Sequence, residues 1–414
     1  MMHSVKRFFQ LLKGNLQILT ISTLIWTFFQ QIIAPYEVLY IFSLGGSGVT
    51  LSIITAIQLI LGIFLMVLGG YIADIYGRRW IIGIVTTLSS FSYLLYVFAQ
   101  NWSWILIGAS LLSLTYIYGP ALEAIRADSV RPTERGRSFV LLTILPKIPG
   151  IVSPVLGGIL IANAFAPYRI NIQGARVGFL FLFLGMLVSG LIRLFFLRET
   201  FFNKTNTHNN YKTIHRRAFK EVYKTIFNSG REIQKLILLN GFFMFCFHFG
   251  VTFRSAYAVH VKGISTVQWG LIESISQIST IVTAFIIGDF IDRYGRKKIF
   301  IPALSLLGIA TLIFVTSNSF TYFLLAMMLI YIGLMARMMA LQVLIADTIP
   351  RTIRGRIMGA TNILGSIGSH GSIMISGFLY DLSPALPYYI SIVMYTLAIL
   401  VAFKFLKESS IRQL

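Results

Sequence analysis

Long apolar runs, separated by short polar segments, extend along almost the whole chain of 414 residues. A helix rises about 1.5 Å per residue, so roughly 20 apolar residues cross the ~30 Å hydrocarbon core of a bilayer. Twelve runs have this length and are too uniformly apolar for barrel strands, and each predicts a transmembrane helix that satisfies its own backbone hydrogen bonds. The expected spans are 16–42, 49–73, 80–98, 103–125, 138–162, 177–197, 236–261, 267–290, 297–316, 320–346, 357–379 and 385–405.

Residues 198–235 form the only sizeable polar stretch. Its position predicts a bundle of six helices at 1–197, a cytoplasmic linker at 198–235 and a second bundle of six helices at 236–414. Within the linker, residues 211–224 have apolar positions spaced to permit an amphipathic helix on the inner membrane face, and an irregular linker is the alternative.

Two short segments that each end a long apolar run are near copies of one another, 218 residues apart. Both follow the pattern G-x-x-x-D-x-x-G-R-[RK]. The shared positions are Gly70, Asp74, Gly77, Arg78 and Arg79 in the first copy, and Gly288, Asp292, Gly295, Arg296 and Lys297 in the second.

A second pair of segments recurs in the same order, at an offset of 219 residues. It begins with an Ala–Asp pair that contains Asp128 or Asp347 and ends with R-G-R at Arg137 or Arg356. Two matched pairs in one order indicate that the chain is a tandem duplication of a membrane half.

Composition supports a membrane environment, because 56% of the residues are hydrophobic, only 12% are charged and the mean hydropathy is +0.78. Such a chain is too apolar to cover itself with a polar surface in water. The expected fold class is therefore an all-α integral membrane protein with twelve transmembrane helices in two pseudo-symmetric bundles of six.

Most of the 35 basic residues lie before the first span, in loops after even-numbered spans, or after the last span. By the positive-inside rule, this distribution predicts cytoplasmic termini and a multi-pass protein of the plasma or inner membrane. The net charge of +21 is spread over short loops, which favours contact with anionic lipid headgroups over nucleic-acid binding.

The twelve spans, the six-plus-six repeat, the central loop and the duplicated motif together resemble the major facilitator superfamily. The resemblance covers nearly the full chain. It implies two bundles related by an axis along the membrane normal, a substrate cavity between them and rocking-type alternating access.

The residues of the repeated motif also have a physical interpretation. Gly70 and Gly288 remove a side chain where helices approach closely, and Gly77 and Gly295 permit a tight turn into the next span. The Asp of each motif, residue 74 or 292, lies where the amino terminus of a helix attracts a carboxylate.

The family resemblance supplies partners for these charges. It implies that Asp74 meets the start of the eleventh span and Asp292 the start of the fifth. It also implies that Arg78 pairs with Asp128 and Arg296 with Asp347, which would make the motifs a cytoplasmic gate. The alternative is that these charges are interfacial anchors.

A third motif in the fifth span resembles the signature of drug–proton antiporters of this family. It contains Gly150, Pro154, Gly157 and Gly158, with Ser153 where glycine is usual. Proline removes a helix hydrogen bond and glycine permits close packing, so we expect a bent helix against a neighbour. The resemblance favours export over import.

One departure argues against the usual antiporter mechanism. Such proteins carry an arginine shortly before a glycine of the fourth span, whereas Gly119 follows residues 114–118, which include no basic side chain. Proton coupling by that route is in doubt.

Polar and ionisable residues inside the spans are further candidates, because burying a charge in hydrocarbon costs at least a few kcal/mol unless it is paired or faces water. Lys147 and Arg337 are expected to face a cavity or a partner, whereas the histidines are as well explained by packing. The candidates for the substrate or the coupling ion are Gln30, Gln31, Tyr36, Glu37, Glu123, Lys147, His248, Arg254, Arg337 and His370. Glu37 and Arg254 have similar expected depths, which predicts an outer gate, and two separately solvated charges are the alternative.

The sequence contains no G-x-x-x-x-G-K-[ST] phosphate loop, no Cys/His metal spacing and no G-x-S-x-G elbow. We therefore expect a monomeric secondary transporter without a cofactor or catalytic residues, exporting a small organic compound, with protons as a candidate coupling ion. A proton-coupled uptake carrier for a sugar, organic acid or amino acid is the alternative within transport. An integral-membrane enzyme or a nontransporting receptor is the alternative from another class.

Overall fold

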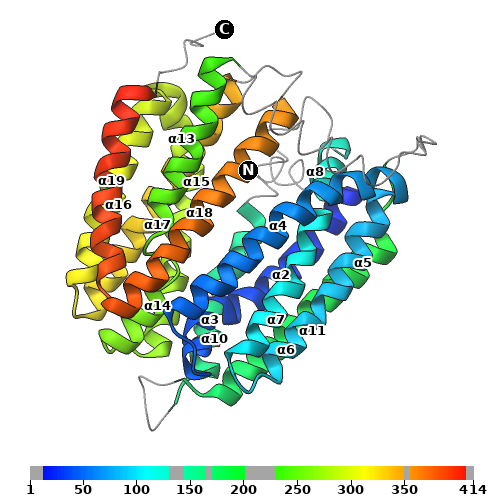
Figure 1. Ribbon diagram of the computed structural model, residues 1–414, viewed down its shortest axis with the longest axis horizontal. Helices are drawn as coiled ribbons and strands as arrows, with labels where there is room; N and C mark the ends of the chain where they lie inside the picture. Colours follow the sequence, from blue (N-terminus) through cyan, green and yellow to red (C-terminus); the bar gives the residue numbers. More distant parts are fainter. Residues whose placement is uncertain (1–12, 130–143, 164–169, 201–229, 349–353, 407–414) are drawn as a thin grey trace, which may run out of the picture. The chain divides into compact units, whose positions relative to one another are not determined.

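The computed structural model describes residues 13–129, 144–163, 170–200, 230–348 and 354–406 (Figure 1). Within these ranges the regular structure is entirely helical. Contacts divide the chain into an N-terminal unit, Met1–Gly45 with Ile60–His215, and a C-terminal unit, Gly46–Leu59 with Arg216–Leu414. The division near residue 215 lies within the predicted linker, and residues 211–224 of that linker lie outside the described ranges.

Of the first four predicted spans of the N-terminal half, the second is one continuous helix, α4, and the other three are interrupted. Their elements are α2 (Asn15–Ile33), η1 (Ala34–Tyr36), α3 (Glu37–Ser43), α4 (Gly48–Tyr76), α5 (Arg78–Ser90), α6 (Ser92–Val97), α7 (Trp102–Leu112), η2 (Ser113–Tyr118) and α8 (Gly119–Asp128). Prolines lie within the first two residues of both η1 and α8, where a missing N–H costs little. The remaining elements of this half are η3 (Leu145–Ile151), α10 (Ser153–Leu160) and α11 (Ile172–Phe196).

The C-terminal half is built from longer helices. They are α13 (Arg231–His248), α14 (Arg254–Ala256), η4 (Tyr257–Val261), α15 (Thr266–Tyr294), α16 (Arg296–Thr316), α17 (Phe320–Thr348), α18 (Arg354–Leu382) and α19 (Leu386–Phe405). The start of α15 carries a capping box, in which Ser265 and Gln268 each bond the other's backbone N–H. Such a cap contributes about 1 kcal/mol to helix stability.

Nine helices of the described residues are long and apolar enough to cross a membrane. The other three predicted spans have local reasons for falling short. Residues 138–143 of the fifth lie outside the description, the seventh is interrupted after His248, and α18 is rich in Ser and Gly.

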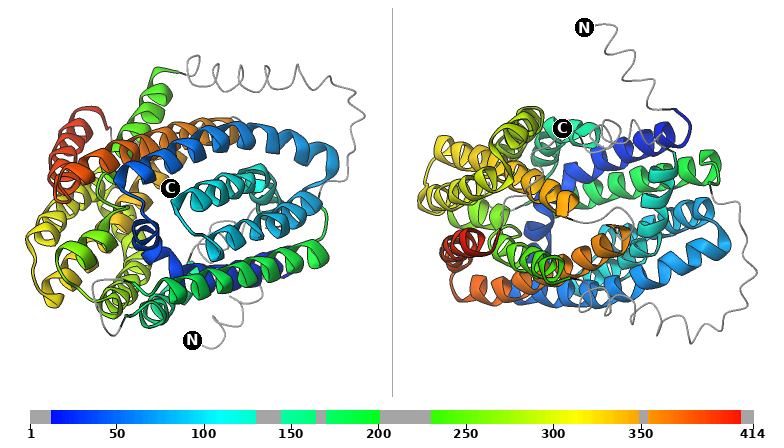
Figure 2. Two further views of the ribbon diagram at one scale, coloured as in Figure 1. Left: turned by 60° about the horizontal axis from the view of Figure 1, so that its bottom comes forward. Right: turned by 90° about the horizontal axis from the view of Figure 1, so that it is seen from above.

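Within each unit the long helices pack side by side. Helices α2 and α11 run together in the N-terminal unit, as do α13 and α18 in the C-terminal unit (Figures 1 and 2). A core of Leu19, Ile82, Ala121, Ile125 and Leu197 joins α2, α5 and α8 beside the residue that follows α11. These apolar contacts fix the ends of the helices that carry the repeated motifs.

The repeated motif forms a sharp turn in both halves. Gly77 and Gly295 have φ of +89° and +98°, a backbone conformation that favours glycine. A Cβ on Gly77 would also lie 2.6 Å from a carboxylate oxygen of Glu199. Helices α5 and α16 therefore begin immediately after α4 and α15 end, as the sequence predicted.

A Cβ on Gly288 would meet nothing within 4 Å in the described part of the chain, so the close helix contact expected there stays a prediction. In the first half the close contact is at Gly69, whose Cβ would lie 1.9 Å from the carbonyl oxygen of Ile117. One residue corresponds to a rotation of about 100° on a helix, so the face that meets η2 is that of Gly69. The side-chain position of Gly70 lies outside the description.

Candidate functional site

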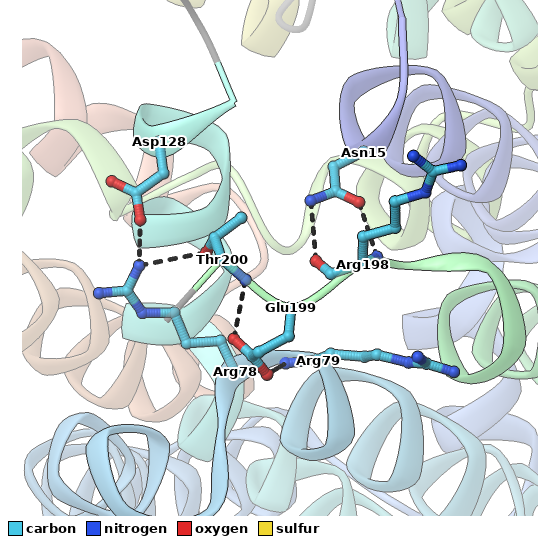
Figure 3. Close-up of polar contacts among 7 residues, drawn as sticks. All are labelled: Asn15, Arg78, Arg79, Asp128, Arg198, Glu199 and Thr200. Carbon is cyan, nitrogen blue, oxygen red and sulfur yellow. Dashed lines mark hydrogen bonds and ion pairs between the residues drawn. The ribbon is translucent and has the colours of Figure 1, made fainter. Parts of the chain in front are cut away.

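In the N-terminal unit, the repeated motif lies in a network of polar contacts at the ends of four helices (Figure 3). The Arg78 guanidinium, at the start of α5, forms an ion pair with Asp128, at the end of α8, and donates to the Thr200 hydroxyl at 3.4 Å. The pair is partly wet, with 15% of the Arg78 side chain and 46% of the Asp128 side chain exposed. A pair with this exposure contributes up to about 1 kcal/mol, so its main effect is on position.

Arg79 connects the start of α5 to the end of α11. Its guanidinium donates to the carbonyl oxygens of Leu194 and Phe195 at 3.1–3.3 Å, and its backbone N–H donates to Glu199 at 3.1 Å. A cation at the carboxyl end of a helix and an anion at the amino end are both favourable for the helix dipoles.

The C-terminal unit repeats this arrangement. Arg296, at the start of α16, contacts Asp347 near the end of α17 at 2.9 Å. Lys297 donates to the carbonyl oxygen of Phe403 at 2.8 Å, near the end of α19. In each half, consecutive basic residues therefore join the start of one helix to the ends of two others, and we call these two networks the junctions.

The structure thus brings together the charges that the two motif pairs predicted. Asp292 is exposed, and its expected partner lies in the other unit. The side chains of Asp74 and Arg356, and all of Arg137, lie outside the description. The role of all these residues as a gate stays a prediction.

The fifth-span motif forms a bend. A 3₁₀ segment, η3, is followed directly by α10, and Pro154 lies within the first two residues of α10. A Cβ on Gly157 would lie 1.8 Å from the carbonyl oxygen of Ile32, so α10 packs on α2 without room for a side chain. Tyr36, a candidate cavity residue, is buried and donates to the carbonyl oxygen of Pro154 at 2.6 Å.

Other candidates of the N-terminal unit are dispersed. Glu123 is exposed and forms an ion pair with Arg126 one turn away, at 2.6 Å. Lys147, in η3, is partly buried. Glu37 lies beside Tyr93 and Tyr96, within its own unit.

The candidates of the C-terminal unit lie on neighbouring helices, along with a carboxylate that the sequence analysis did not select. Glu273 of α15 accepts a hydrogen bond from the Tyr331 hydroxyl of α17 at 2.5 Å. Arg254 acts electrostatically on Glu273, and Arg254, Arg337 and His370 act on His248. We call this group the C-terminal polar cluster: His248, Arg254, Glu273, Tyr331, Arg337 and His370.

Both histidines of the C-terminal polar cluster are tied to their own helices. The Nδ1 atoms of His248 and His370 lie 2.8 Å from the carbonyl oxygens of Met244 and Ser366. Asn240 also has a packing role, because it donates to the carbonyl oxygen of Thr361 at 3.0 Å and joins α13 to α18.

A second contact of the C-terminal unit lies at the opposite end of the helices from its junction. The carboxylate of Asp381 accepts the backbone N–H groups of Gly48 and Val49 at 2.7 and 2.8 Å, capping α4. A Cβ on Gly48 would lie 2.3 Å from the carbonyl oxygen of Gly377, so the two backbones touch. The sequence signal for this cap was a lone acid at the end of a predicted span.

A family model described as Major Facilitator Superfamily matches residues 19–275 and 252–413. The magnetosome protein MamH of Paramagnetospirillum magneticum is 35% identical over 104 residues, which cover 24% of each chain, so this chain spans about a quarter of that relative. A D-xylose-proton symporter has a TM-score of 0.70 at 16% identity, with 96% of this chain and 98% of that chain covered. The nucleoside transporter NupG has a TM-score of 0.64 at 16% identity, with 94% of this chain and 97% of that chain covered. The predicted class of twelve helices in two bundles is confirmed.

Proposed function

Because this chain belongs to the major facilitator superfamily, we propose that it is a secondary active transporter that moves a small organic compound across a membrane by alternating access. The fold indicates a transporter rather than an enzyme. The observation that carries the mechanism is the duplicated junction, in which each half uses the same two basic positions to hold three helix ends.

The junctions suit a gate because their contacts are individually weak. Partly exposed ion pairs and helix-end contacts each contribute about 1 kcal/mol or less, so a change of partners between two states is inexpensive. We propose that Asp74 and Asp292 complete the cytoplasmic gate at helix starts of the opposite half, and that Glu37 and Arg254 act on the outer side.

Export is the proposed direction, and it rests on the bent fifth span. The bend at Pro154 and the contact of Gly157 with α2 give this half a feature that the second half lacks, since its equivalent segment around His370 has no proline. Proton-coupled uptake is the second candidate, favoured by the partly buried Glu273–Tyr331 contact inside the C-terminal unit. Multi-pass insertion in the plasma membrane, cytoplasmic termini and a monomeric state complete the proposal.

Flux in sealed proteoliposomes that contain only this protein tests the function. A thermal-shift panel on purified protein first selects ligands, because binding to the native state raises apparent stability by mass action. Counterflow of a selected compound is the expected result. Chemical conversion of the compound would favour an enzyme, and binding with neither flux nor conversion would favour a receptor.

A further inference from the structure

Arg337 is a buried cation whose donors are left over after the fold is complete. It lies eleven residues from the end of α17, or about 16 Å along the helix, and is 4% exposed. Its Nε and Nη1 atoms have no hydrogen-bond partner in the described part of the chain. Its guanidinium lies 4.6 Å from the centre of the Phe247 ring, a cation–π contact that does not use the N–H groups of Nε and Nη1.

Burial alone does not produce this situation. Arg193 of the N-terminal unit is also 4% exposed, yet its Nε, Nη1 and Nη2 atoms donate to the hydroxyls of Ser22, Thr86 and Thr23 at 3.0–3.4 Å. The chain thus gives each guanidinium nitrogen of one buried arginine a hydrogen-bond partner. The open donors of Arg337 are a specific property of its site.

The surrounding charges leave an excess of one positive charge. Arg254 and Arg337 are both buried, and Glu273 is the acidic residue on which Arg254 acts, whereas Asp289 and Asp292 of the same helix are exposed. Glu273 already accepts the Tyr331 hydroxyl. A buried charge requires a counter-charge or polar partners, and within the described ranges the Nε and Nη1 atoms of Arg337 have no hydrogen-bond partner.

Further unfilled hydrogen-bonding groups lie at the same level. Because α16 connects them, α15 and α17 run in the same direction, and the contact of Tyr331 with Glu273 sets their register. Arg337 lies six residues beyond Tyr331 on α17, a distance of about 9 Å along the helix. Six residues beyond Glu273 on α15 is residue 279, so Arg337 and residue 279 lie at about the same height. The neighbouring Gln277 Oε1 and Thr280 Oγ1 are buried, and neither has a partner within the described ranges.

The histidines define the other side of the site. A carbonyl oxygen only accepts, so the Nδ1 atoms of His248 and His370 carry the proton in these contacts. Each Nε2 atom is then an acceptor in the neutral ring and a donor in the charged ring. His248, His370 and Glu273 are only partly buried, unlike Arg254 and Arg337.

We propose that the C-terminal polar cluster binds the carboxylate of a small organic monoanion, with Arg337 as its anchor. One monoanion neutralises the excess charge, and its remaining polar groups meet Gln277, Thr280 and the histidine Nε2 atoms. This inference rests on the proposed transport function and names its substrate class.

The test uses matched pairs of carboxylates and neutral amides on purified full-length protein: benzoate with benzamide, 4-hydroxybenzoate with 4-hydroxybenzamide, and lactate with lactamide, with benzylamine as the cation. We expect at least one carboxylate to raise the melting temperature, and its amide to have little effect. Stabilisation by no carboxylate, or equally by the amides, overturns the anion site.

Three variants assign the effect to Arg337. We expect Arg337→Met to weaken the apparent affinity for the active carboxylate at least ten-fold and Arg337→Lys to retain part of it. Lys262→Met removes a cation from the same unit but outside the cluster, where it contacts Asn318, and we expect unchanged affinity. Full affinity in Arg337→Met overturns the assignment of Arg337 as the anchor. If that variant does not fold, competition between carboxylates and amides for the wild-type protein decides whether the ligand class is a carboxylate.

Counterflow in proteoliposomes separates the two proposals. Binding of a carboxylate without flux would contradict transport and leave the anion site standing. Flux of amides or amines that is unaffected in Arg337→Met would contradict the anion site and leave transport standing.

Discussion

Replacing the two buried arginines by methionine should have different effects on stability. Methionine is unbranched and close to arginine in length, so it fills most of the space while removing the charge and the donors. Arg193 and Arg337 are equally buried, and they differ in whether the protein completes their hydrogen bonds.

For Arg193→Met, three charge-assisted hydrogen bonds are lost. Such bonds contribute about 1.5–3 kcal/mol each, and the contacts with Thr23 at 3.2 Å and Thr86 at 3.4 Å are longer than the one with Ser22 at 3.0 Å. Since Ser22 and Thr86 keep their own bonds to the carbonyl oxygens of Leu19 and Ile82, we expect a loss of about 3–5 kcal/mol rather than the full sum.

For Arg337→Met, the balance is different. Removing an unsatisfied buried donor relieves about 1–3 kcal/mol, and losing the contact with the Phe247 ring costs about 0.5–2 kcal/mol. The free energy of unfolding without ligand should therefore change by between about −1 and about +2.5 kcal/mol, which is well short of the loss expected for Arg193→Met.

Two spectroscopic probes report on the two units separately. Cys246 is the only cysteine of the chain, lies in α13 and is 1% exposed, so a fluorogenic thiol reagent reports on opening of the C-terminal unit. Four of the five tryptophans, at positions 26, 80, 102 and 104, lie in the N-terminal unit, and their fluorescence reports on that unit. Each kcal/mol shifts the melting temperature by about 2 °C or less in a chain of this size.

We expect the tryptophan transition of Arg193→Met to fall by several degrees and the thiol transition of Arg337→Met to fall far less or to rise. An equal loss in both variants would refute the reasoning. It would mean that Arg337 is held by polar partners as effectively as Arg193 and has a structural role.

Three further changes test the ends and the middle of the bundles. Asp347→Asn removes an ion pair worth up to about 1 kcal/mol and should reduce flux more than expression, with the exposed Glu232→Gln as an unaffected control; unchanged flux would refute a gate. Asp381→Asn removes the charge that caps α4 at Gly48 and should lower the thiol transition by the equivalent of about 0.5–2 kcal/mol, and an unchanged transition would show that the cap is dispensable. Lys147→Met should abolish most transport while leaving the tryptophan transition in place, and full transport with normal pH dependence would make this residue structural.

The repeated motifs could be recognised in the sequence because a second copy at an equivalent position makes a chance match unlikely. A single D-x-x-G-R segment is ambiguous, but two copies at equivalent positions predicted the turns at Gly77 and Gly295, and the family resemblance implied the pairing of Arg78 with Asp128. These features depend on neighbours in sequence and on helix order, which the apolar pattern already specifies.

The contacts made by Glu199, Asp381 and Gly69 were not predictable in the same way. Each depends on which helix face meets a segment far away in the chain, such as Gly69 against Ile117 or Asp381 against Gly48. Glu273 did have a signal, an acid seven residues into an apolar run, but its hydrogen bond with Tyr331 depends on the register of α15 and α17.

The duplication also shows where the halves have diverged. The helix that carries Asp128 matches the helix that carries Asp347 at an offset of 219 residues, and at this offset Arg337 corresponds to Tyr118 of the N-terminal half. The junctions have kept their charges in both halves, as a shared mechanical role requires, while the buried cation of α17 has no counterpart at this position. A structural need common to both bundles would be met at both positions. The asymmetry therefore supports the proposal that Arg337 recognises a ligand, which requires a buried charge on one side only.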